Sequence, residues 1–137
     1  MSVPDVGFRK WLGLDYEVME DGHAVVSLRL DADKRNLRDV AHGGVVASLI
    51  DIAMGTAAAG GNYDRRKRLV VTLEMKVNYL APATGDRLTA VADVVRAGSR
   101  TSVVRCEVKT DRGELCAVGL GTFITRRPHP NDPETNV

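Results

Sequence analysis

The distribution of apolar residues along the chain predicts one long, buried helix. Residues 45–59 are dominated by apolar and small side chains and by good helix formers, and Gly60 and Gly61 follow as a stop signal. Since apolar side chains occupy nearly the whole circumference of this helix, other elements must cover it on most sides.

Strands are predicted on both sides of this helix in the sequence. Two segments before the helix and four after it have the apolar alternation of strands, namely residues 14–19, 24–30, 69–80, 87–95, 101–109 and 114–126. A short amphipathic helix is expected over residues 3–11. One curved antiparallel sheet folded around one long central helix satisfies both patterns, which gives an α+β fold.

The segment 69–80 alternates most regularly. If the alternation is strict, every second side chain points to the same face of the strand. One face then carries Val71, Leu73, Met75, Val77 and Tyr79, and the other carries Val70, Thr72, Glu74, Lys76 and Asn78.

Composition and charge indicate an ordinary globular domain. The 137 residues are 44% apolar and 27% charged, which suits one domain with its own core. We assign this domain to residues 1–127 and a mobile tail to residues 128–137. A net charge of +1 and only 4% aromatic residues argue against nucleic acid as a partner.

Neither a metal nor a membrane is predicted. Cys106 and Cys116 lack the spacing of a zinc site and are expected to be small buried residues in strands. Residues 40–63 contain Asp51 as their only formal charge, but small residues dominate, which predicts a helix of a globular protein rather than a membrane span. Residues 1–14 lack the apolar core of a signal peptide, so a cytoplasmic location is expected.

The sequence His42-Gly43-Gly44 at the start of the long helix is a first candidate for chemistry. Glycines let another group approach the backbone closely, and a helix N-terminus carries unpaired N–H groups and a partial positive charge. Such donors stabilise the oxyanion that develops in acyl transfer. The alternative is structural, with the glycines permitting close packing and His42 capping the helix.

Asp51 is a second candidate because it interrupts the apolar helix. An ionised carboxylate among apolar neighbours is costly unless it is paired or used. It could accept a hydrogen bond from a polar neighbour and do nothing else, or it could act as general base or nucleophile.

The spacing of the two candidates implies a dimer if they cooperate. Gly43 and Asp51 are eight residues apart, which is about 12 Å along a helix. They are too distant to act on the same carbonyl, so Gly43 of one chain would have to meet Asp51 of another, most simply about a two-fold axis.

These residues resemble a known family. Asn36, the segment 41–44, Asp51, the segment 71–75 and the segment 78–83 together are similar to the hotdog-fold acyl-CoA thioesterases, in particular the phenylacetyl-CoA thioesterase (PaaI-like) branch. The resemblance spans residues 14–125. It implies a helix wrapped by an antiparallel sheet, dimers that pair into tetramers, and hydrolysis of a thioester to a free acid and coenzyme A. It implies no metal and no separate cofactor, since coenzyme A is part of the substrate, and it favours an arylacetyl or hydroxyaryl acyl group.

The resemblance also implies roles for individual residues. The Gly43 N–H would polarise the thioester carbonyl, and Asp51 of the partner would attack it or activate water. Asn36 would hold the water or the carboxylate, and His42 would support the carbonyl end. Thr72 occupies the place where the family often has a small hydroxyl near the carboxylate, although threonine is also simply a common strand residue.

Coenzyme A brings phosphates, and the resemblance implies where they bind. The segment 96–101 resembles the phosphate-side loop of the family and supplies Arg96, Gly98, Ser99, Arg100 and Thr101. Ser99 departs from the Lys or Arg that the family often has there. Glu74 and Tyr79 belong to the strand that the family uses along the ligand. The basic run 65–68 is either a solvated loop or a further phosphate contact.

Three other functions remain open from the sequence. A hotdog hydratase or dehydratase would need a histidine and a carboxylate placed to move protons at adjacent carbons, whereas His42 precedes the helix. A non-catalytic module that binds acyl-CoA would not need Asp51. An interaction protein with a tolerated buried aspartate is the third. Release of free thiol from an acyl-CoA separates hydrolysis from all three.

Overall fold

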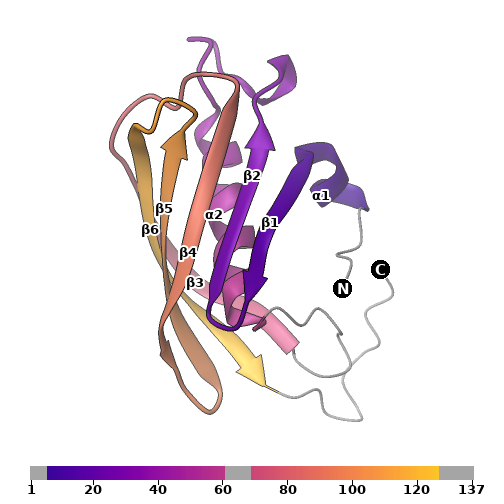
Figure 1. Cartoon of the computed structure of the whole chain (residues 1–137), viewed down its shortest axis with the longest axis vertical. Helices are drawn as coiled ribbons and strands as arrows, with labels where there is room; N and C mark the ends of the chain where they lie inside the picture. The colour runs from indigo at the N-terminus through magenta and orange to yellow at the C-terminus, as the bar shows by residue number, and fades with distance from the viewer. Residues whose placement is uncertain (1–5, 61–68, 127–137) are drawn as a thin grey trace.

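The fold is one antiparallel sheet with a long helix lying across one of its faces (Figure 1). The structure, a computed structural model, describes residues 6–60 and 69–126. In chain order the elements are α1 (Gly7–Leu12), β1 (Leu14–Glu20), β2 (His23–Arg29), the 3-10 turn η1 (Ala32–Lys34), α2 (Gly43–Ala58), β3 (Leu69–Tyr79), β4 (Arg87–Ala97), β5 (Thr101–Thr110) and β6 (Leu115–Arg126).

The six strands follow the order β1-β2-β4-β5-β6-β3, and each neighbouring pair is antiparallel. The predicted α+β architecture and all six predicted strands are therefore confirmed. The helix α2 begins two residues before the predicted start, because His42 caps it, and it ends beside Gly60, whose φ of 68° is readily adopted by glycine.

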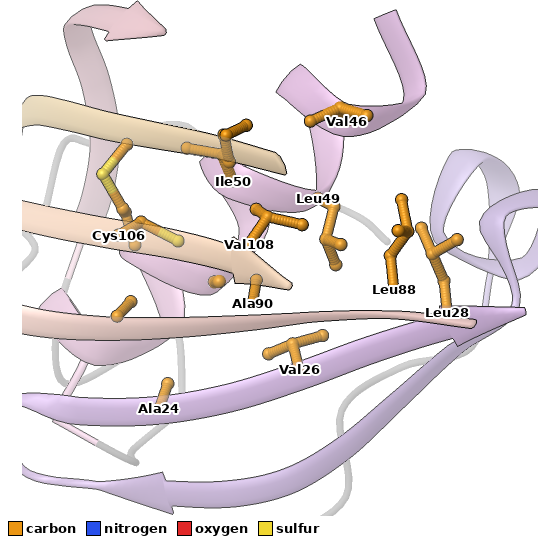
Figure 2. Packing of buried hydrophobic residues seen from close by; sticks show 14 of the residues in the cluster. Ala24, Val26, Leu28, Val46, Leu49, Ile50, Leu88, Ala90, Cys106 and Val108 are labelled. Atoms are coloured by element: carbon orange, nitrogen blue, oxygen red, sulfur yellow. The ribbon is translucent and has the colours of Figure 1, made fainter. Parts of the chain in front are cut away.

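The core lies between α2 and the sheet, and α2 contacts every strand. Figure 2 shows Leu49 and Ile50 of α2 facing buried side chains of the strands, among them Val26, Leu88 and Val108. Glycines in β6 permit the close approach. A Cβ at Gly119 would lie 2.7 Å from Ile50 Cγ2, and one at Gly121 would lie 2.9 Å from Met54 Cε.

One stripe of α2 stays uncovered in the single chain, which differs from the full coverage that its apolar sequence predicts. Gly44 is exposed, and Ala47, Ser48, Asp51 and Gly55 are only partly buried. Their spacing of three and four residues puts them on one side of the helix. The sheet therefore covers the opposite side of α2, and this small-residue side is open.

The strand β3 contains a bulge that corrects the predicted division of its faces. Thr72 pairs with Phe123 and Glu74 pairs with Thr122, so Leu73 is an extra residue in β3. After the bulge the alternation is shifted by one position. Val70 and Thr72 consequently share the helix-side face with Met75, Val77 and Tyr79, whereas Val71 and Leu73 are exposed.

Two sequence predictions lie outside the described residues, namely the basic run 65–68 and the tail 128–137. Within the described ranges, none of the helices has the length and apolar character required to cross a membrane.

Candidate active site

The N-terminus of α2 presents an unused backbone donor. Gly43 is the first residue of the helix, and His42 caps it by accepting a hydrogen bond at Nδ1 from the Gly44 N–H (2.9 Å). The following amide, that of Val45, donates to the His42 carbonyl. Among the residues that the structure describes, the Gly43 N–H meets no acceptor. It is thus free to donate to a ligand at the positive end of the helix dipole.

Tyr79 holds this end of the helix against β3. Its hydroxyl donates to the Gly43 carbonyl oxygen over 2.7 Å. The ring also lies close to Gly43, since a Cβ built there would be 3.4 Å from the Tyr79 hydroxyl oxygen. The predicted site residues His42, Gly43 and Tyr79 are therefore together, and His42 has the capping role that was the structural alternative.

The Asp51 carboxylate lies two turns further along α2. Thr72 Oγ1 on β3 donates a hydrogen bond to Asp51 Oδ1 over 2.7 Å. The structure therefore brings Thr72 to the carboxylate, and it does so because the bulge at Leu73 allows Thr72 and Tyr79 to share one face of β3. Asp51 is only partly buried, which corrects the prediction of a carboxylate enclosed by apolar neighbours.

Gly43 and Asp51 do not converge within one chain. Both belong to the same uninterrupted helix, so eight residues separate them by about 12 Å along its axis. The single chain holds a free amide and a partly exposed carboxylate at two places on the open side of α2.

Asn36 lies in the tight turn that leads into α2. Its Oδ1 accepts a hydrogen bond from the Arg38 N–H (2.8 Å), and its own N–H donates to the Val40 carbonyl (2.8 Å). The side chain is exposed. Its carboxamide oxygen is therefore engaged in the turn, and the carboxamide nitrogen has no partner among residues 6–60 and 69–126.

Glu74 lies on the face of β3 that points away from α2. Its Oε1 accepts a hydrogen bond from Thr122 Oγ1 (2.7 Å) on the neighbouring strand. It does not adjoin Thr72 and Tyr79, because the bulge separates their faces.

The predicted phosphate-side residues lie in the turn between β4 and β5 and in the strand ends on either side of it. Gly98 donates its N–H to the Thr101 carbonyl, and a Cβ on Gly98 would lie 2.7 Å from that oxygen, so the turn itself requires glycine. Arg96, Ser99 and Arg100 are exposed. Thr101 pairs with Ile124, which pairs with Val71, so this turn is two strands from the Thr72 end of β3.

The cysteines do not provide a nucleophile. Cys106 and Cys116 are buried in β5 and β6, as predicted, and both are free. Burial raises the pKa of Cys106 to about 12 and also raises the pKa of Cys116. Both side chains are therefore neutral thiols near neutral pH, whereas the reactive form of cysteine is the thiolate.

A cleft beside the N-terminus of α2 was not predicted. It has a volume of about 400 Å³ and is lined by Phe8, Trp11, Asp33, Arg35, His42, Gly44, Val45 and Ser48. The sequence signal was limited to the three-residue spacing of Phe8 and Trp11, which places both on one side of α1 without saying what they border.

Comparison with known proteins gives the family. A family model described as the thioesterase superfamily matches residues 39–117, which is more than half of the chain. The medium/long-chain acyl-CoA thioesterase YigI of Escherichia coli K12 is 28% identical over 90% of this chain and 88% of its own length.

Solved structures agree with this match. The conserved protein PA5202 of Pseudomonas aeruginosa is 38% identical, with a TM-score of 0.80 over 88% of this chain and 94% of the other. The PaaI protein of the E. coli phenylacetic acid degradation operon is 30% identical, with a TM-score of 0.77 over 88% and 83%. The resemblance found in the sequence is confirmed, and among the functions left open the hydrolase is supported. The chain belongs to the thioesterase superfamily and is a thioester hydrolase with the hotdog fold.

Proposed function

We propose that this protein is an acyl-CoA thioesterase whose two active sites are each shared between two chains. The observation that carries the proposal is the pair of groups on the open side of α2, the unused Gly43 N–H and the Asp51 carboxylate held by Thr72. The name of YigI as an acyl-CoA thioesterase supports coenzyme A as the thiol part of the substrate.

The proposed chemistry uses these two groups on opposite sides of one thioester. The Gly43 N–H donates to the carbonyl oxygen and stabilises the negative charge that develops on it. Asp51 of the other chain either removes a proton from the attacking water or attacks the carbonyl carbon itself. In both routes the C–S bond breaks, coenzyme A leaves as a thiolate that takes up a proton, and water supplies the oxygen that completes the acid.

Three further side chains have supporting roles in this proposal. Thr72 fixes the carboxylate through its 2.7 Å hydrogen bond to Oδ1, which leaves the other carboxylate oxygen for water or substrate. His42 orders the first turn of α2 and so aims the Gly43 N–H. Asn36 offers its carboxamide nitrogen to the water or to the carboxylate.

A two-fold dimer brings the distant groups together. If two α2 helices pack antiparallel with the axis near Ala47, halfway between Gly43 and Asp51, then each Gly43 faces the partner's Asp51. The open side of α2 suits this contact, because Ala47 at its centre is small and permits close packing. The strand β3 lies at an edge of the sheet with unpaired backbone groups and extends the same contact. We further propose that two such dimers form the tetramer that the family resemblance implies.

Coenzyme A is expected to reach the β4–β5 turn from this site. Arg96 and Arg100 would meet its phosphates, Gly98, Ser99 and Thr101 would supply backbone and hydroxyl groups, and Tyr79 would border the ligand along β3. Glu74, which the sequence also suggested as a ligand contact, lies on the opposite face of β3 and is left out of this proposal. We propose that the reaction needs no metal and no cofactor beyond coenzyme A itself.

The activity is tested by following free thiol release from a series of acyl-CoA thioesters that includes phenylacetyl-CoA, hydroxyaryl-CoA and aliphatic acyl-CoA. We expect saturable thiol release that is unchanged by a chelator. The ratios of kcat/KM identify the acyl class. An absence of release from every thioester, with the protein folded, would overturn the proposed function.

The shared site is tested by mixing two inactive variants, Asp51→Ala and Gly43→Pro. After subunit exchange at equal amounts, half of the dimers are mixed, and each mixed dimer has one site that contains both native groups. We therefore expect recovery of roughly a quarter of the native activity per chain. No recovery after exchange has been confirmed, for example by affinity-tag capture, would show that the two groups do not form one site across two chains.

A further inference from the structure

Two exposed aromatic side chains, Phe8 and Trp11, form one wall of a cleft next to the candidate site. Phe8 and Trp11 of α1 are 57% and 46% exposed, and their rings are stacked with centroids 6.0 Å apart and planes 9° apart. They line the cleft of about 400 Å³ described above. A volume of this size is within the range of small-molecule sites.

The aromatic wall is held in place from behind. The Lys34 ammonium lies 5.1 Å from the centre of a Trp11 ring, within the range of a cation–π contact. Lys34 is only 3% exposed, and its Nζ also donates to Asp31 Oδ2 over 2.7 Å. The Lys34 carbonyl accepts a hydrogen bond from the His42 N–H, so the same residue connects Trp11 with the start of α2. Lys34 therefore fixes Trp11 relative to the start of α2, and Phe8 stacks on Trp11.

The cleft continues into the candidate site. His42 and Gly44, which flank the free Gly43 N–H in the chain, belong to its lining, together with Val45 and Ser48 on the first two turns of α2. A thioester carbonyl at the Gly43 N–H therefore has the cleft directly beside it. Its polar rim consists of Asp33 and Arg35, on the η1 side. The Arg35 guanidinium donates hydrogen bonds to the carbonyl oxygens of Leu30, Asp39 and Gly85.

We propose that this cleft binds the acyl part of the substrate, with the rings of Phe8 and Trp11 covering an apolar acyl group that is larger than acetyl. The inference rests on the proposed function and names its substrate class. It assigns to α1 the selection of the acyl group, whereas the β4–β5 turn would bind the other end of the substrate. Covering the two rings removes apolar surface from water, which is the driving force for the selection.

The first test uses Trp11, which is the only tryptophan of the chain, as the reporter. In an Asp51→Asn background, which prevents turnover, decanoyl-CoA or phenylacetyl-CoA is expected to change the tryptophan emission saturably, and acetyl-CoA and coenzyme A are not. The first two ligands distinguish an aliphatic from an aryl preference. If calorimetry shows that decanoyl-CoA and phenylacetyl-CoA bind while the emission stays constant, the acyl group lies elsewhere and the inference is wrong.

The second test compares kinetics. We expect Phe8→Ala to lower kcat/KM for decanoyl-CoA about ten-fold relative to its effect on acetyl-CoA, since a buried aromatic contact is lost. Leu120→Ala is the matched control, because Leu120 is 49% exposed but lies on the sheet face away from α2, and it should not change the ratio. An unchanged ratio in Phe8→Ala overturns the inference while leaving the hydrolase intact.

Two outcomes separate this inference from the proposed function and from an interface. An emission change with decanoyl-CoA but no thiol release from any thioester would retain the acyl site and reject hydrolysis. In the other outcome, Phe8→Ala lowers kcat/KM equally for decanoyl-CoA and acetyl-CoA, and light scattering shows that the variant protein dissociates. Phe8 would then contact a second copy of the chain, and the inference would be rejected.

Discussion

Replacing Asp51 by asparagine is expected to lower kcat by about two to four orders of magnitude, the range for removing a positioned acid–base group. Asparagine keeps an oxygen that can accept the Thr72 Oγ1 hydrogen bond, and the position is only partly buried, so the fold should be preserved. The amide nevertheless cannot take a proton from water or form an acyl anhydride. Thiol release from the preferred acyl-CoA, measured with circular dichroism of the same sample, checks both statements.

The matched control for this variant is Glu17→Gln. Glu17 also accepts a hydrogen bond from a hydroxyl group, with Ser27 Oγ at 2.9 Å from its Oε1, but it lies on β1 at the opposite edge of the sheet. This control should keep native turnover. If Asp51→Asn turns over as fast as the native chain, the carboxylate is structural and the proposed site must be abandoned.

The architecture could be predicted because its signals are local. The apolar run around the whole of α2, the glycine stop and the alternation in six strands are properties of short segments, and they leave one economical arrangement. The capping of α2 by His42 was also available as an alternative, since side chains at this position commonly accept from the first free amides. The order of the strands in the sheet was not predicted, because these local patterns do not indicate which strands pair.

The site could be predicted only in part, because it depends on tertiary features. The faces of β3 were assigned wrongly because Leu73 is an extra residue in the strand. The sequence alternates regularly on both sides of Leu73, but the face to which each side chain points is reversed beyond the bulge. This reversal puts Thr72 and Tyr79 on one face and Glu74 on the other. The aromatic cleft was missed because no property of residues 7–12 indicates that α1 borders the N-terminus of α2.

The partial exposure of Asp51 also has a tertiary cause. From the sequence, an aspartate amid apolar residues suggests burial, whereas in the chain it lies on the side of α2 that the sheet does not cover. The proposed cross-chain site requires a second chain to cover this side of α2. A direct test of the proposed site therefore needs a substitution at Gly43 that removes its N–H group and leaves the helix intact.

Gly43→Pro is such a change, and it is expected to lower kcat by about two to three orders of magnitude, the effect of removing one oxyanion donor. Gly43 is the first residue of α2, where proline is well tolerated because its missing N–H would have no helical partner. The preceding residue, His42, already has a ψ of 136°, which is the conformation that proline requires before it. Substitution by proline therefore removes the proposed donor and keeps the capping bond from Gly44.

Gly43→Ala is the control that keeps the N–H. The added Cβ would lie 3.4 Å from the Tyr79 hydroxyl oxygen, an ordinary contact, so only a small change in kcat is expected. The two variants are compared by thiol release at saturating acyl-CoA and by thermal unfolding. Equal activities in Gly43→Pro and Gly43→Ala would show that the amide does not bind the carbonyl. A large loss in the proline variant alone, at unchanged stability, would assign the oxyanion site to this single N–H, because no side chain has been removed from the helix.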